Sequence, residues 1–240
     1  MPVSQFGAPR GLRGRVAAHV VARLTGDANR WMVECLDVGP HDRVLDVGCG
    51  PGLAVARAAE VSAGGVVGVD ASETMVRMAR RRNQAAGRQG RVEIRRADAA
   101  RLPYPDAHFT RACSLNSLQF WPAPADGLRE LFRVLDAGGR VAVVLMARRD
   151  DPAGPGIPPW LQATSGTMRA AGFADLEIST RTFGGVVHWA VIATRPDGTR
   201  ESGAPLDPTA DGVRKGAIDQ YTYDVRFVES RNWDSEKKWD

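Results

Sequence analysis

The chain has 240 residues, of which 43% are hydrophobic and 25% charged, the ordinary balance of a globular domain with its own core. No stretch approaches the roughly 18 apolar residues of a membrane-spanning helix, and the three cysteines form neither a disulfide framework nor a metal-ligand spacing. The net charge of +4 comes almost wholly from arginine, with the few lysines near the C-terminus, which we interpret as base composition rather than nucleic-acid binding. We therefore expect a cytoplasmic protein of one main domain, with no metal and no membrane partner.

Residues 1–42 predict an N-terminal helical cap. Apolar residues such as Val16, Val20 and Leu24 recur at helical spacing, and Gly39-Pro40 ends the pattern. The start of this segment is rich in arginine and free of acids, so an organelle-targeting sequence stays open as the alternative.

From residue 43 onward, short apolar runs alternate with helical patterns. Strands are expected at 43–47, 65–70, 91–98, 109–115 and 140–147, and helices at 52–61, 72–86 and 123–135, with Ser72 as an N-cap. Such alternation indicates right-handed βαβ crossovers, a parallel sheet and helices on both faces.

The later part has a different pattern. A loop rich in proline and glycine at 150–159 leads to a helix at 160–171, and Gly184-Gly185 separates strands at 173–183 and 186–195 as in an antiparallel hairpin. The fold class is therefore α/β, a Rossmann-like three-layer sandwich whose seven-stranded sheet is mostly parallel. Residues 196–240 form a tail. A disordered extension, an added strand and non-native sequence are the alternatives for it, and we assign it no function.

A glycine-rich turn joins the first strand to the first helix of residues 43–195. Gly48, Gly50 and Gly52 allow the backbone to turn sharply and to approach a ligand at the carboxyl edge of the sheet. The spacing differs from the G-x-G-x-x-G of nicotinamide-dinucleotide enzymes. Asp46, two residues before the first glycine, would repel a pyrophosphate and suits a cationic ligand.

Two further acids follow the next two strands. Asp70 closes the second strand, where a carboxylate accepts the hydroxyls of a ribose, and Asp98 closes the third. Parallel topology places Asp46, Asp70 and Asp98 at one edge of the sheet, so we expect them to converge. The alternative for each acid is a helix cap or turn residue.

Over about residues 43–195 the chain resembles the class I S-adenosylmethionine-dependent methyltransferases, of the small-molecule type that includes quinone-biosynthesis enzymes. The motifs that carry the resemblance are DVGCGPG (46–52), VVGVDAS (66–72), ADA around Asp98, LPYPDAHF (102–109) and RELFRVLDAGGRVAVV (129–144). Thr110 departs from the pattern, since many relatives have Asp after that Phe.

The resemblance implies S-adenosylmethionine as cofactor and gives the three acids roles. Asp46 would engage the ammonium group, Asp70 the ribose hydroxyls and Asp98 the adenine amino group. The other implied contacts lie in the glycine turn, beside the adenine and at the end of the fourth strand: Gly48, Cys49, Gly50, Gly52, Ala71, Ser72, Met75, Ala99, Ser114, Leu115 and Asn116.

Methyl transfer from a sulfonium is an in-line displacement that positioning and desolvation can drive, and it needs a base only where the acceptor loses a proton. His41 and His108 precede strands, which places them at the edge away from the ligand, and His19 lies in the cap. His188 begins the last strand, at the ligand edge. We therefore name His188 as the candidate catalytic base, against a hydrogen-bonded rim histidine as the alternative.

The acceptor is expected to be a small, partly apolar molecule. Phe6, Trp31 and Trp121 are candidate walls, with ordinary packing as the alternative, and Asn116 and Gln119 are candidates to orient the acceptor. The lid is expected from residues 1–42 and 148–159, and the assembly is a monomer or homodimer. A non-catalytic nucleotide-binding module and an NAD-dependent oxidoreductase remain alternative functions.

Overall fold

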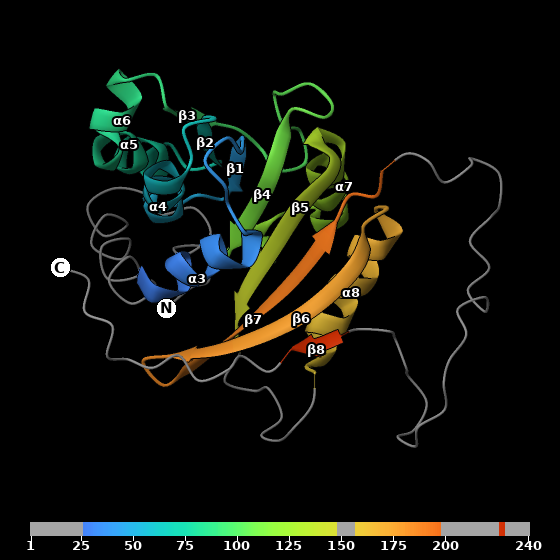
Figure 1. The fold of residues 1–240 in the computed structure, drawn as a ribbon. Helices are drawn as coiled ribbons and strands as arrows, with labels where there is room; N and C mark the ends of the chain where they lie inside the picture. The colour runs from blue at the N-terminus through green and yellow to red at the C-terminus, as the bar shows by residue number, and fades with distance from the viewer. Residues whose placement is uncertain (1–25, 148–156, 198–225, 229–240) are drawn as a thin grey trace, which may run out of the picture.

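The structure is a computed structural model that describes residues 26–147, 157–197 and 226–228. Its strands form one eight-stranded sheet of order β3-β2-β1-β4-β5-β7-β6-β8 (Figure 1). The strands are β1 (Val44–Val47), β2 (Val66–Asp70), β3 (Val92–Arg96), β4 (Phe109–Leu115), β5 (Leu135–Met146), β6 (Ala174–Phe183), β7 (Val186–Thr194) and β8 (Arg226–Val228). The helices are α3 (Gly26–Leu36), α4 (Leu53–Val61), α5 (Glu73–Arg82), α6 (Gln84–Arg88), the short 3-10 helix η1 (Leu118–Phe120), α7 (Pro124–Val134) and α8 (Pro159–Ala170).

The first five strands are parallel, and β7 then runs antiparallel to both β5 and β6. The β6–β7 hairpin turns at Gly184 and Gly185, whose φ values of 55° and 77° suit a tight two-residue turn. The predicted α/β class, the parallel order and the antiparallel hairpin are confirmed. The short β8 pairs parallel with β6 and adds an eighth strand, one of the options left open for the tail.

Two element boundaries differ from the prediction. β5 begins at Leu135, directly after α7, because Gly138 and Gly139 join the strand through hydrogen bonds with Arg195 (N···O 2.8 Å in each direction) instead of ending the helix. The helix predicted over 72–86 is two helices, α5 and α6, and Asn83 lies between them.

The sheet separates two hydrophobic layers. One layer packs α3, α4 and α5 onto the sheet, and the other packs α7 and α8 onto the opposite face (Figure 1). The central strands are buried on both sides, which explains their nearly continuous apolar sequence. The predicted three-layer arrangement is thus confirmed. Because both faces of the sheet are covered by apolar layers, polar groups lie mainly at the ends of the strands.

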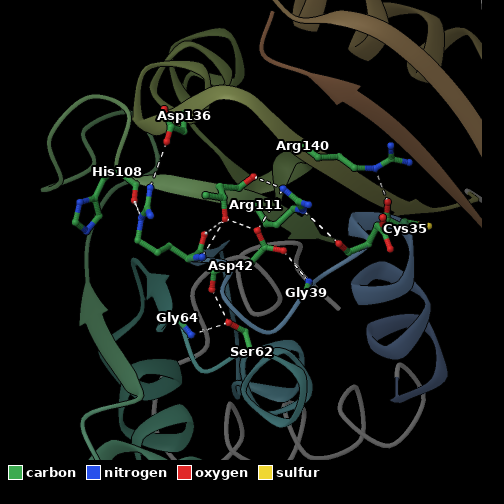
Figure 2. A network of polar contacts seen from close by, with 12 residues as sticks. Cys35, Gly39, Asp42, Ser62, Gly64, His108, Arg111, Asp136 and Arg140 are labelled. Atoms are coloured by element: carbon green, nitrogen blue, oxygen red, sulfur yellow. Dashed lines mark hydrogen bonds and ion pairs between the residues drawn. The ribbon is translucent and has the colours of Figure 1, made fainter. Parts of the chain in front are cut away.

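A polar network fastens the amino edge of the sheet (Figure 2). The Thr110 hydroxyl donates to Asp42 Oδ1 at 2.7 Å and accepts the Arg43 backbone N–H at 3.0 Å, and Arg111 adds an ion pair to Asp42 at 3.4 Å. The Arg43 side chain donates to the His108 carbonyl at 2.6 Å. Thr110, the departure from the family pattern, therefore holds β1 to β4 at the edge opposite the acids.

Several predictions lie outside the described residues. The cap is described only from Gly26, so His19 and Phe6 lie outside it, as do the loop at 148–156 and most of the tail. No helix within 26–147 or 157–197 has the length and hydrophobicity of a membrane-spanning segment.

Candidate functional site

Gly48, Gly50 and Gly52 in the turn after β1 all have a left-handed backbone conformation, but the space around them differs. Gly48 and Gly52 have φ values of 77° and 78°, and a Cβ at either would collide with the protein itself: with Ser117 Oγ at 1.7 Å and with Asn83 Nδ2 at 2.6 Å. Gly50 has φ 52°, and a Cβ there would meet nothing within 4 Å. Packing therefore requires the first and third glycines, while the second faces open space where a ligand can approach.

Asp46 is a buried carboxylate in the middle of the sheet, 3% exposed on β1. Its cross-strand neighbours are Gly68 on β2 and Cys113 on β4, and the Cys113 thiol donates a hydrogen bond to it. Burial, and then the negative charge of Asp70, raise the pKa of Asp46 to about 7. No described side chain forms a salt bridge with Asp46, so its charge lacks a cationic partner.

Asp70 closes β2 and holds two backbone amides. Its Oδ2 accepts the Gly50 N–H at 2.9 Å, and its Oδ1 accepts the Ser72 N–H at 2.8 Å. Burial raises the pKa of Asp70, and the two hydrogen bonds oppose that rise. Each oxygen keeps a further lone pair for a ligand hydroxyl.

Asp98 lies at the same edge but apart from the buried Asp46 and the half-buried Asp70. Its side chain is exposed and accepts the Ala100 N–H at 3.0 Å, an Asx turn after β3. Ala99 beside it is buried, at 8% exposure. The expected convergence therefore holds for Asp46 and Asp70, while Asp98 presents an exposed carboxylate one strand further along.

The segment after β2 has the expected helix start. Ser72 caps α5 and its hydroxyl accepts the Met75 N–H at 3.5 Å, as predicted. Met75 is buried, Ala71 is exposed, and the Ala71 carbonyl accepts a hydrogen bond from Arg96 at 3.1 Å. These residues follow directly on Asp70, at the same edge.

The end of β4 supplies three more of the predicted residues. Ser114 is fully buried and its hydroxyl has no partner among the described residues. Leu115 packs partly against the α3–α5 layer. Asn116, with φ 51°, accepts the Met146 N–H on its Oδ1 at 2.7 Å, so its amide joins the ends of β4 and β5. Gln119 donates to the Asn116 carbonyl at 3.0 Å.

Cys49, predicted as a cofactor contact, directs its side chain inward. It is 7% exposed and belongs to the core under α4, and its sulfur lies 3.0 Å from where a Cβ on Gly68 would be. Burial first, and then Asp46 and Asp70, raise the pKa of this thiol. Only its backbone follows the turn toward the ligand edge.

The histidines divide as predicted. His188 is the third residue of β7 and pairs with Met146, the last residue of β5, so it lies at the carboxyl edge of the parallel strands. Its Nδ1 lies 3.1 Å from the Val186 carbonyl, and its Nε2 is a buried atom with no partner among the described residues. Burial lowers its pKa. His108 precedes β4 at the amino edge and stacks on Tyr104.

The two described aromatic candidates for acceptor walls are packed instead. Trp31 is 3% exposed in the α3 core, and the Trp121 indole donates to Ser117 Oγ at 2.9 Å while its ring lies over Gly127. Three arginines of the basic runs Arg80–Arg82 and Arg95-Arg96 donate to backbone carbonyls: Arg80 to that of Ile94, Arg82 to that of Pro51 and Arg96 to that of Ala71.

Sequence reasoning missed four residues that shape the site. Asn83 donates to the Gly52 carbonyl at 3.1 Å, Arg82 to that of Pro51 at 2.9 Å, Ser117 packs on Gly48, and Cys113 bonds to Asp46. Cys113 and Ser117 flank the strand-end segment Ser114–Asn116 that the sequence analysis singled out. All four contacts join residues that lie 31 positions or more apart in the chain.

The family model described as "Methyltransferase domain" matches residues 45–143. That range runs from β1 to β5 and contains the glycine turn and all three acids. The chain contains a class I S-adenosylmethionine-dependent methyltransferase domain. S-adenosylmethionine is the cofactor of such a domain, and the open side of Gly50 and the unpartnered charge of Asp46 fit it.

Two methyltransferase relatives align with different shares of this chain. An "Uncharacterized methyltransferase YdaC" from Bacillus subtilis is 24% identical over 185 residues, which are 75% of this chain and 98% of that protein. "Methyltransferase GfsG" from Streptomyces halstedii is 38% identical over 125 residues, 51% of this chain and 45% of GfsG. This chain thus spans less than half the length of GfsG.

Solved structures share the fold of the methyltransferase domain. The "[4+2]-Cyclase SpnF" has a TM-score of 0.62 at 24% identity, over 72% of this chain and 82% of SpnF. A phosphoethanolamine N-methyltransferase from Haemonchus contortus, solved with S-adenosylhomocysteine, has a TM-score of 0.60 at 17% identity, over 71% of this chain and 53% of its own. At these identities the likeness shows the fold alone.

Proposed function

We propose that the protein transfers a methyl group from S-adenosylmethionine to a small-molecule acceptor by direct in-line displacement. The observation that carries the proposal is Asp46: a buried carboxylate with no cationic partner among the described residues, beneath a turn whose Gly50 faces open space. A buried charge of this kind is costly unless a cation completes it. S-adenosylmethionine carries an ammonium group and a sulfonium, and it supplies the electrophilic methyl group.

Different residues of the domain would bind different parts of S-adenosylmethionine. Asp46 serves the ammonium end and Asp70, fixed by Gly50 and Ser72, serves the ribose hydroxyls. Asp98 and the backbone of Ala99 serve the adenine amino group, with Ala71, Ser72 and Met75 beside the ring. The cofactor would also contact the glycine turn and the end of β4, at Gly48, Gly52, the backbone of Cys49, Ser114, Leu115 and Asn116.

These residues act by orientation rather than by covalent chemistry. Binding of the methyl donor at two acids and a rigid turn removes much of its translational and rotational freedom before the reaction. This loss of entropy on binding lowers the barrier to methyl transfer. Neither Cys49 nor Cys113 is suited to be a nucleophile, because burial and Asp46 raise the pKa of both thiols. The acceptor itself attacks the methyl group.

Turnover with a radiolabelled methyl donor tests the proposal. The protein is incubated with tritiated S-adenosylmethionine and a panel of quinols, phenols, enols and amines, after calorimetry has established S-adenosylhomocysteine binding. Transfer to any acceptor supports a methyltransferase. Tight cofactor binding with no transfer across the panel favours a non-catalytic binding module, and binding of NAD alone would overturn the assignment.

A further inference from the structure

His188 is one of only two buried side chains that have an unpartnered polar atom among the described residues. The other, Ser114, lies on the face of the sheet that carries α7 and α8, since it pairs with Val143 of that layer. His188 alternates with Ala190 and Ile192 and so faces the α3–α5 side, as Asp46 does beside Val44. Leaving a buried hydrogen-bonding atom unpaired is unfavourable, so Nε2 is available to accept a hydrogen bond from a ligand.

The hydrogen bond at the other ring nitrogen fixes the tautomer of His188. A carbonyl only accepts, so the Nδ1–H donates to the Val186 carbonyl at 3.1 Å and Nε2 keeps its lone pair. Burial lowers the pKa of His188, so the ring is neutral at pH 7. His188 is thus held in the form that accepts a proton at Nε2.

The surroundings of His188 are apolar and their charges are paired. Phe183 lies with its ring centroid 5.4 Å from that of His188, and Met146 and Val186, 43% and 39% exposed, are its neighbours on the same face. Arg181, directly opposite His188 on β6, forms an ion pair with Glu34 of α3 at 3.0 Å and lies over the Trp31 ring at 5.6 Å.

The position of His188 suits a reaction at the end of β4. Leu115, Val144 and Ala190 align across three strands, so His188 lies two residues beyond that level toward the carboxyl edge. From β4 to β7 there are two inter-strand spacings, roughly 10 Å. An acceptor held between the end of β4 and Nε2 therefore spans about one small ring.

We propose that His188 is the general base of the methyl transfer and that the acceptor is an apolar molecule with a phenolic or enolic hydroxyl. This inference rests on the proposed function. The hydroxyl proton moves to Nε2 as the oxygen forms its bond to the methyl carbon and the carbon–sulfur bond breaks. The products are a methyl ether, the neutral sulfide and the imidazolium, which then passes its proton to water. A phenol, with a pKa near 10, is within reach of an imidazole base.

An amine acceptor fits these surroundings less well. It arrives as an ammonium ion and requires a carboxylate partner, yet Glu34 is already paired with Arg181. The other groups facing His188 from β5 and β6 are Met146 and Phe183, which hold no charge. The chemistry therefore favours a neutral, flat acceptor with an acidic hydroxyl.

A binding experiment tests the inference without turnover. The full chain, with its histidines labelled with nitrogen-15 and saturated with S-adenosylhomocysteine, is titrated with 1-naphthol, 2-naphthol and 1,4-naphthoquinol, and with 1-methoxynaphthalene as a control that cannot donate. A saturable shift of the His188 Nε2 resonance with at least one hydroxyl compound and none with the ether supports the inference. No shift with any of the three overturns it.

Turnover of the compound that shifts Nε2 completes the test. His188→Asn keeps an amide donor near the Nδ1 position and removes Nε2, and it should lower kcat about 100-fold or more at pH 7. The wild-type rate should be level above pH 7, whereas the variant should rise about tenfold per pH unit toward the pKa of the phenol. The control His108→Asn, at the amino edge, should match the wild type.

Failures of the two proposals are distinguishable. If the wild type does not bind S-adenosylhomocysteine, the proposed function fails. If it binds the cofactor product but His188→Asn keeps the wild-type kcat and pH profile, or if only amines are methylated, the role of His188 alone is wrong. His188→Gln provides a second variant should the first fail to fold.

Discussion

Asp70 fixes the glycine turn by accepting the Gly50 N–H on its Oδ2 at 2.9 Å. The same carboxylate accepts the Ser72 N–H at the start of α5, so one side chain joins the turn after β1 to the helix after β2. A residue assigned to the cofactor ribose therefore also shapes the surface that the cofactor would contact.

Asp70→Ala should weaken binding of S-adenosylhomocysteine by about 1–3 kcal/mol, or 5- to 150-fold, because a hydrogen-bonded charge is lost and the turn is released. Isothermal titration calorimetry measures the change. Asp126→Ala, which removes an exposed carboxylate paired with Arg129, is the matched control and should leave the Kd unchanged. An unaltered Kd in Asp70→Ala would contradict the ribose assignment.

Cofactor binding should depend on pH through Asp46. Its pKa of about 7 in the absence of ligand means that the carboxyl must lose its proton to pair with the ammonium group. Binding should therefore tighten as pH rises, by roughly tenfold between pH 6 and pH 8. Calorimetry of S-adenosylhomocysteine at a series of pH values checks the direction, and the slope should disappear in Asp46→Asn.

Asp46→Asn should stabilise the protein without ligand at high pH. The folded pKa of Asp46 is raised above its unfolded value, so the folded state binds the extra proton and wild-type stability falls as pH rises from about 4 to 7. The amide cannot ionise and still accepts from Cys113. The gain in free energy of unfolding should be roughly 2–4 kcal/mol at pH 8 and small at pH 4. Thermal melts at both pH values, showing equal gains, would be evidence against a raised pKa.

Gly48→Ala should destabilise the fold by about 3–5 kcal/mol, since its Cβ would meet Ser117 Oγ at 1.7 Å in a left-handed conformation. Adding Ser117→Gly should recover more than half of that loss. Gly50→Ala has open space and should cost only about 1 kcal/mol of stability, while weakening S-adenosylhomocysteine binding. Denaturant unfolding measures all three variants, and equal losses at the two glycines would refute the distinction.

Thr110→Val should separate stability from binding. The hydroxyl that bonds to Asp42 and to the Arg43 amide is lost at the amino edge (Figure 2), which should cost about 1–3 kcal/mol in free energy of unfolding. The Kd of S-adenosylhomocysteine should stay within about twofold, because the site lies at the other edge. A large change in the Kd would show that the two edges are coupled.

Much of the fold follows from local signals. Apolar runs at β1, β2, β4 and β5, the Ser72 cap and the Gly184-Gly185 turn each predict their elements directly. The start of β5 is not predictable in this way, because its pairing with Arg195 depends on a strand tip some 55 residues later. Glycine pairs usually end a helix, and here they continue a strand.

The site was predictable where topology alone decides it. The parallel pairing of β1 with β2 places Asp46 opposite Gly68, two residues before Asp70, so both acids lie toward the same end of the sheet. The thiol of Cys113 and the amide of Asn83 were not foreseen, because each reaches the site from an element placed by tertiary packing. The exposure of Asp98 and the inward direction of Cys49 likewise depend on side-chain orientation, which spacing does not give.

A crystal structure of the protein with S-adenosylhomocysteine tests the central claim most directly. The account predicts both ribose hydroxyls within hydrogen-bonding distance of the Asp70 carboxylate, and the ammonium group on the Asp46 side of the glycine turn. A nucleoside bound elsewhere, with Asp46 and Asp70 contacting no part of it, would contradict the account.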